Sequence, residues 1–143
     1  MTVGRTVAGI EFRPVTELPW VLVVHGDDPL ADRTTIAPAD LADVALIRLP
    51  EHSVSRRHLD AALTRLGVRP HSENGATDWN TAVLLAGLGI GHALVPALSY
   101  DGGDVCRVPV PFVPPLAVGW ATRRWAALPA LTHEFAGLVE ADI

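Results

Sequence analysis

Two short polar stretches carry the side chains of this chain that are best suited to hold a small molecule. Pro50-Glu-His-Ser-Val-Ser55 and Thr77-Asp-Trp79 each precede residues with the apolar spacing of a helix, so each should form a helix start. The first N–H groups of a helix lack acceptors within the helix and lie at the positive end of its dipole. The candidate ligand-binding residues are therefore Pro50, Glu51, His52, Ser53, Ser55, Thr77, Asp78 and Trp79.

These residues also have a second interpretation as ordinary structural groups. Serine, threonine and aspartate at such positions commonly cap their own helices, which would leave them no role toward a ligand. Trp79 lies on an apolar stripe, where a tryptophan packs in a core or stacks on a ligand from a cleft wall. Arg56 and Arg57 add positive charge beside the first stretch, whereas Glu51 weakens the case for an anion.

No constellation of acid, base and nucleophile emerges from the other reactive side chains. Cys106 is the single cysteine, which excludes an internal disulfide and a cysteine-based zinc cage. The six histidines show no metal-ligand spacing. Gly87-Leu-Gly-Ile-Gly91 follows a helix and opens a strand, the reverse of a dinucleotide fingerprint. We expect no cofactor, no metal and no enzymatic activity.

Composition sets the remaining bounds on partners and location. The 143 residues suit a single core, and the net charge of −5 repels a phosphate backbone, so we expect no direct contact with nucleic acid. The N-terminus lacks the features of a secretory signal, and the most apolar window is shorter than the ~20 residues that a spanning helix needs. We therefore expect a cytoplasmic location and no membrane contact.

The second helix start belongs to the strongest structural signal in the sequence. Asp78 suits an N-cap, and an apolar stripe follows it at Trp79, Val83, Leu84 and Leu88. A glycine turn then leads into a short apolar run, residues 90–95. A helix that feeds a buried strand in this way predicts half of a right-handed crossover, and hence a mostly parallel sheet.

The rest of the chain reads as further strands and helices. Strands are predicted at residues 7–12, 18–24, 44–49, 68–73, 105–110 and 116–122. A helix after Ser55 should bury Leu59, Leu63 and Leu66 and end at Gly67. A last helix at residues 129–139 gathers Leu131, Phe135, Leu138 and Val139 on one side.

The order of these elements resembles the effector-binding (substrate-binding) domain of LysR-type transcriptional regulators, cytoplasmic relatives of the periplasmic binding proteins. The resemblance covers roughly residues 7–139. It is carried by Leu18-Pro-Trp-Val-Leu-Val-Val-His-Gly-Asp-Asp-Pro-Leu-Ala31, by Asp40-Leu-Ala-Asp43 before Leu46-Ile-Arg-Leu49, by residues 83–96 and by Leu128-Pro-Ala-Leu-Thr-His-Glu-Phe135. It implies an α/β fold of the periplasmic-binding-protein-like type II class, an open parallel or mixed sheet with flanking helices.

The resemblance also implies a division of the chain into subdomains. Residues 1–20 would be a remnant of the first subdomain with the first connecting strand, and residues 21–115 the complete second subdomain. Residues 116–143 would supply the return strand and C-terminal helix of the first subdomain. The family's winged helix-turn-helix and linker helix have no counterpart in this sequence, which we interpret as an N-terminally truncated regulator.

The implied function is ligand sensing. Both helix starts would face a cleft between the subdomains, where a small and often anionic effector would bind, and the protein would form a homodimer. An alternative is a self-associating interaction module with no ligand binding of its own. That alternative follows from uncovered sheet edges and an apolar face on the last helix.

Overall fold

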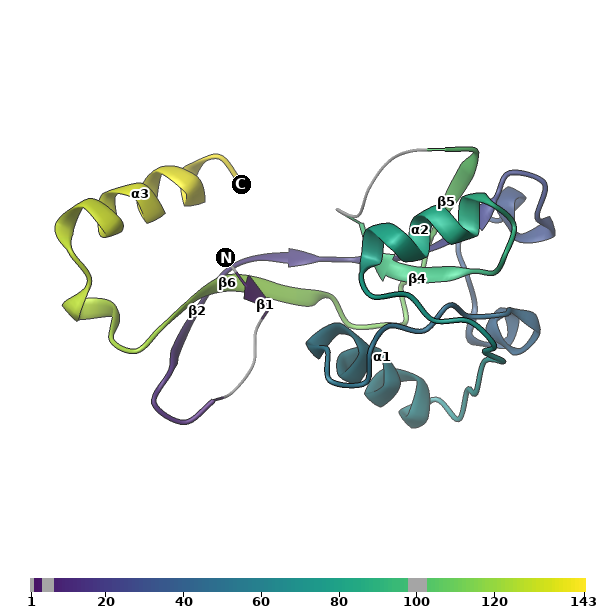
Figure 1. Cartoon of the computed structure of the whole chain (residues 1–143), viewed down its shortest axis with the longest axis horizontal. Coiled ribbons are helices and arrows are strands. Elements are labelled where there is room, and N and C mark those ends of the chain that lie inside the picture. The colour runs from purple at the N-terminus through teal and green to yellow at the C-terminus, as the bar shows by residue number, and fades with distance from the viewer. Residues whose placement is uncertain (1, 4–6, 98–102) are drawn as a thin grey trace. The chain divides into compact units, whose positions relative to one another are not determined.

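The computed structural model describes residues 2–3, 7–97 and 103–143, and it divides into two compact units (Figure 1). The core unit comprises Leu18–Leu116, and the flanking unit comprises Met1–Glu17 with Ala117–Ile143. The predicted assignment of residues 1–20, 21–115 and 116–143 to two subdomains stays a prediction. Across the described ranges, none of the helices has the length and apolar character needed to span a lipid bilayer.

Strand β3 (Trp20–His25) lies at the centre of the sheet in the core unit. It pairs antiparallel with β4 (Ala93–Pro96) on one side and with β5 (Val105–Pro109) on the other. Its run of Trp, Val and Leu explains this position, because a strand with neighbours along both edges and packing on both faces needs apolar side chains throughout. Leu22, Val23 and Val24 are completely buried.

Residues 44–49 extend this sheet through parallel bridges. The N–H of Leu46 donates to the carbonyl of His71 at 2.7 Å, and the N–H of Ile47 donates to the carbonyl of His92 at 2.8 Å. The prediction of a mostly parallel sheet is therefore wrong, and the sheet is mixed. The bridge between residues 46 and 92 is parallel, as a crossover through α2 requires. Strand β4, which follows residue 92, pairs antiparallel with β3 on its other edge.

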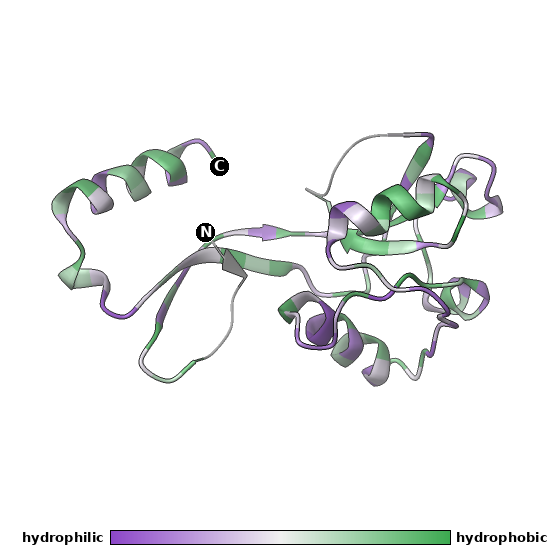
Figure 2. Cartoon of the chain, viewed as in Figure 1, coloured by the Kyte–Doolittle hydropathy of each residue, from purple (hydrophilic) through white to green (hydrophobic). Residues whose placement is uncertain are grey.

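Helix α2 (Trp79–Gly87) forms where a helix was predicted, and it packs against β3 and β4 (Figures 1 and 2). The face that it buries differs from the predicted one. Ala82, Val83 and Ala86 are buried, whereas Leu84 and Leu88 are 56% and 66% exposed. The predicted stripe through Leu84 and Leu88 is wrong, because the small alanine side chains let the helix backbone approach the sheet.

Helix α1 (Val54–Arg65) confirms the helix predicted after Ser55, but it begins two residues earlier than expected, at Val54. Leu59, Ala62 and Leu63 are buried, whereas Leu66 lies beyond the helix and is 45% exposed, against prediction. Gly67 ends this segment with a φ of 68°, a conformation that favours glycine. Two 3-10 helices, η1 (Pro29–Asp32) and η2 (Pro38–Asp43), connect β3 to residues 44–49.

The flanking unit contains a small sheet with the strand order β1 (Thr2–Val3), β6 (Leu116–Thr122), β2 (Glu11–Leu18). The expected strand at residues 7–12 is corrected, since a turn containing Gly9 precedes β2, which begins at Glu11. Gly119 of β6 cannot be replaced without a shift, because a Cβ atom there would lie 2.0 Å from the carbonyl oxygen of Arg13.

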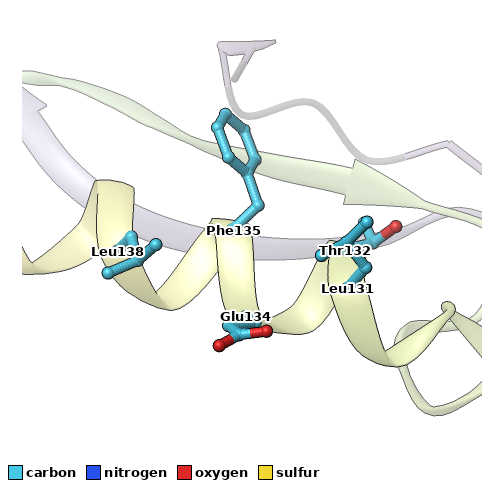
Figure 3. A pocket seen from close by; sticks show the side chains of 5 residues that line it. All are labelled: Leu131, Thr132, Glu134, Phe135 and Leu138. Carbon is cyan, nitrogen blue, oxygen red and sulfur yellow. The ribbon is translucent and has the colours of Figure 1, made fainter.

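Helix α3 (Ala130–Ala141) follows the short η3 (Trp125–Ala127) in the flanking unit. Trp120 donates from its Nε1 to Glu140 at 3.0 Å, and its ring meets Phe135 edge to face at 6.4 Å. Leu131, Phe135 and Leu138 project from α3 beside a hollow of about 460 Å³ (Figure 3). They are 76%, 59% and 65% exposed, so an apolar face of this helix is uncovered within its unit.

Candidate ligand-binding site

The two predicted helix starts come together around one hollow of about 250 Å³ within the core unit. Six of the eight candidate residues line it, and Glu51 and His52 do not; both of these are exposed. Leu49 and Asn80 also line it and were not among the candidates. The full lining is Leu49, Pro50, Ser53, Ser55, Thr77, Asp78, Trp79 and Asn80.

Backbone pairing explains why the two starts are neighbours. The N–H of Arg48 donates to the carbonyl of Asn74 at 3.0 Å, and the N–H of Ala76 donates to the carbonyl of Arg48 at 2.9 Å. Two parallel segments therefore end side by side, one leading to Pro50 and α1, the other to Thr77 and α2. The carboxyl edge of parallel strands is where ligands bind in open α/β sheets.

Ser53 is the N-cap of α1. Its Oγ accepts a hydrogen bond from the N–H of Arg56 at 3.1 Å, and its own N–H donates to the carbonyl of Pro50 at 3.0 Å. The capping interpretation is thus confirmed for this serine. The N–H groups of Val54 and Ser55 precede the capped one and have no acceptor within the helix, because the first N–H groups of an α-helix lie before its first internal bond.

Ser55 differs from Ser53, although both are serines of the same turn. It is 5% exposed and is the single polar residue among the buried residues described. Ser55 lines the hollow, and its hydroxyl makes no hydrogen bond to any described residue. Because this hydroxyl is not used within the described protein, its hydrogen-bonding capacity is available for a water or a ligand.

Asp78 is the N-cap of α2 and is saturated by its own helix. Oδ1 accepts from the N–H of Thr81 at 2.8 Å, and Oδ2 accepts from the hydroxyls of Thr77 and Thr81 at 3.1 Å each. The Thr81 N–H, with smaller contributions from the two hydroxyls, holds the pKa of Asp78 below its ordinary value of 3.8. The carboxylate stays ionised, and the Thr77 hydroxyl is occupied as its donor.

Trp79 serves the core and borders the hollow at once. It is partly buried and packs against the apolar cluster that contains Val23, Val83 and Val95. It also lines the hollow. The structure therefore confirms the packing role, and stacking on a ligand stays a prediction.

The positive charge near the first helix start is held outside the hollow. Arg56 donates from Nη1 to the carbonyl of Leu49 and from Nε to Asp60, both at 2.7 Å. Neither Arg56 nor the exposed Arg57 lines the hollow. The local attraction for an anion thus comes from backbone N–H groups and the helix dipole. Among the described residues, no three His, Cys, Asp or Glu side chains gather closely enough to hold a metal ion.

Comparison with known protein families decides the family. The family described as LysR substrate binding domain matches residues 4–142. The chain belongs to this family. The resemblance seen in the sequence is thereby confirmed, as is the periplasmic-binding-protein-like type II α/β fold. A comparison with curated protein sequences finds no match.

Solved structures of LysR-family proteins share the fold at low sequence identity. The effector-binding domain of QuiR in complex with shikimate is 21% identical, with a TM-score of 0.81, and the match covers 95% of this chain and 68% of that one. The CcmR regulatory domain of Synechocystis PCC6803 in complex with 2-PG is 16% identical, with a TM-score of 0.84, and the match covers 99% and 70%. HinK from Pseudomonas aeruginosa is 18% identical, with a TM-score of 0.78, and the match covers 96% and 50%. This chain therefore spans about half the length of HinK.

Proposed function

We propose that the chain is the ligand-sensing, effector-binding part of a cytoplasmic LysR-family transcriptional regulator, and that it binds a small anionic effector at the hollow between the starts of α1 and α2. The observation that carries the proposal is Ser55, which is 5% exposed as a residue, lines the hollow and makes no side-chain hydrogen bond to a described residue. The printed descriptions of two structural relatives name bound small molecules, shikimate and 2-PG, and this supports the proposal.

The donors at the hollow suit a carboxylate. The open N–H groups of Val54 and Ser55 and the Ser55 hydroxyl all belong to the first turn of α1, so one anionic group can accept from several of them. Asp78 repels an anion, but its charge is spread over three hydrogen bonds from its own helix and its neighbour. The volume of about 250 Å³ limits the effector to a small molecule.

The proposed activity is binding without chemistry. Ser53 and Asp78 cap their own helices, and the Thr77 hydroxyl donates to Asp78. The described residues that line the hollow include no histidine, lysine or cysteine. Effector binding would shift an equilibrium between arrangements of a homodimeric regulator. Contact with DNA is assigned to other parts of such a regulator, because this chain carries a net charge of −5.

A thermal-shift screen tests the proposal. The full chain is heated with shikimate and with small carboxylic and amino acids, each as the sodium salt at constant ionic strength. A compound at about one hundred times its Kd stabilises the folded state by about 2.7 kcal/mol, which raises Tm by roughly 5–10 °C at this chain length. Ser55→Ala should reduce the shift, whereas Ser72→Ala, on the exposed segment before α2, should not. Flat melting curves across the whole set would contradict the proposal.

One observation favours self-association as a second candidate function. Leu131, Phe135 and Leu138 form an exposed apolar face on α3, which a second copy of the chain could cover. Light scattering of wild type and Leu138→Glu distinguishes the two states. A wild type that stays monomeric at high concentration would remove this candidate.

A further inference from the structure

A second hollow, of about 340 Å³, lies beside the C-terminal half of α1 in the core unit. Its lining shares no residue with that of the hollow at the helix starts. The polar lining consists of two arginines, a threonine and an aspartate. The full set is Arg48, Asp60, Leu63, Thr64, Val68, Arg69 and Pro70.

Positive charge exceeds negative charge around this hollow. Asp60 is shared between two guanidinium groups: its Oδ1 lies 3.2 Å from Nη1 of Arg48, and its Oδ2 accepts from Nε of Arg56 at 2.7 Å. Arg69 is exposed, lines the hollow and forms no ion pair with any described residue. Two guanidinium groups therefore line the hollow with one carboxylate, and Arg56 shares that carboxylate from outside the lining, in a protein whose net charge is −5.

The Arg48 side chain also has a donor that is not satisfied. Its Nη1 is buried, and the nearby Asp60 oxygen is close enough for charge attraction but not aligned for a hydrogen bond. A buried donor in this condition is uncommon in folded proteins, so this nitrogen has capacity for a further acceptor, which a water or an anion can supply. The side chain as a whole keeps 26% of its surface exposed, and it lines the hollow.

We infer that this hollow is a second binding site, for a small oxyanion held between Arg48 and Arg69. A carboxylate or phosphate group has the acceptor geometry that a guanidinium fork binds in bidentate fashion. The Thr64 hydroxyl supplies a further donor from α1. The negative charge of Asp60 repels an anion, so Asp60 lowers the affinity of the site for the oxyanion.

The test is an NMR titration of the full chain labelled with ¹⁵N-arginine. Inorganic phosphate and malonate are added separately, with sodium chloride adjusted to hold the ionic strength constant. The Nε–Hε signals of Arg48 and Arg69 should move in a saturable way with at least one anion, and the anion with the lower Kd identifies the preferred group. Shifts that grow linearly, or that sodium chloride alone reproduces, would overturn the inference.

Two substitutions of opposite sign sharpen the test. Arg69→Ala should weaken binding about tenfold, because it removes a charge-assisted contact at an exposed position where folding is not at risk. Asp60→Asn should tighten binding by about threefold or more, because it removes the competing charge. Affinities unchanged in both variants would overturn the inference. Ser55→Ala should leave phosphate binding unchanged, so this site and the proposed effector site fail or succeed separately.

Discussion

The two serines at the start of α1 should respond differently to alanine substitution, Ser53→Ala in stability and Ser55→Ala in ligand binding. Ser53→Ala removes the acceptor for the N–H of Arg56, which the Ser53 Oγ holds at 3.1 Å. Loss of an N-cap serine costs about 1 kcal/mol of folding free energy. At this chain length we expect Tm to fall by roughly 2–4 °C.

Ser55→Ala should instead change stability little and ligand binding more. The Ser55 hydroxyl has no partner among the described residues, so its removal sacrifices no hydrogen bond to them. The free energy of unfolding should stay within about 0.5 kcal/mol of wild type. The affinity for an effector should fall about two- to tenfold, the value of one hydrogen bond.

Urea unfolding followed by far-UV circular dichroism measures both stabilities. Ser72→Ala is the matched control, because Ser72 is exposed and its hydroxyl makes one long contact, 3.5 Å, to the carbonyl of Asn74. A Ser53→Ala variant as stable as wild type would refute the capping argument. A Ser55→Ala variant that loses as much stability as Ser53→Ala would show that its hydroxyl has a structural partner.

Three further predictions concern the core, the sheet and the acid limb of stability. Leu22→Ala should lower the free energy of unfolding by about 2–5 kcal/mol in a urea titration, whereas Leu84→Ala, at 56% exposure, should change it by less than about 0.5 kcal/mol. Gly91→Ala should lower Tm, because its Cβ would lie 2.7 Å from a backbone carbonyl, while Gly137→Ala, with nothing within 4 Å, should raise it. The pKa of Asp78 in the folded state lies below its ordinary 3.8. The ionised carboxylate therefore stabilises the fold fully above pH 3.8, and this stabilisation is lost as the pH falls through the folded-state pKa. In Tm measurements over a series of acidic pH values, Asp78→Asn should make Tm depend less on pH than in wild type.

Local features of the sequence predicted the site better than they predicted the packing. Ser53 and Asp78 are recognisable caps, because an N-cap depends on the backbone within three residues. The buried face of α2 was missed because Leu84 is more apolar than Ala82, which makes Leu84 the better candidate for burial from sequence. The helix lies so close to the sheet that the small Ala82 is buried and Leu84 is exposed. The antiparallel pairing of β3 with β4 joins residues far apart in the chain, and no local pattern specifies it.

The place of the Arg56 charge could not be predicted from the sequence either. Arg56 stands three residues from Ser53, and proximity in sequence placed its charge at the effector hollow. In the fold, Asp60 one turn later and the Leu49 carbonyl take up its guanidinium group. Leu49 and Asn80 were missed as lining residues because they became neighbours through the parallel pairing of residues 48 and 75.

Titration of the ¹⁵N-labelled chain with the compound that gives the largest thermal shift tests the central claim most directly. The claim is that the first turn of α1 binds an anionic effector. The account predicts saturable shifts of the backbone amide signals of Val54 and Ser55, with a Kd that Ser55→Ala raises. Saturable binding that leaves these two amides unmoved and shifts signals elsewhere in the chain would contradict it.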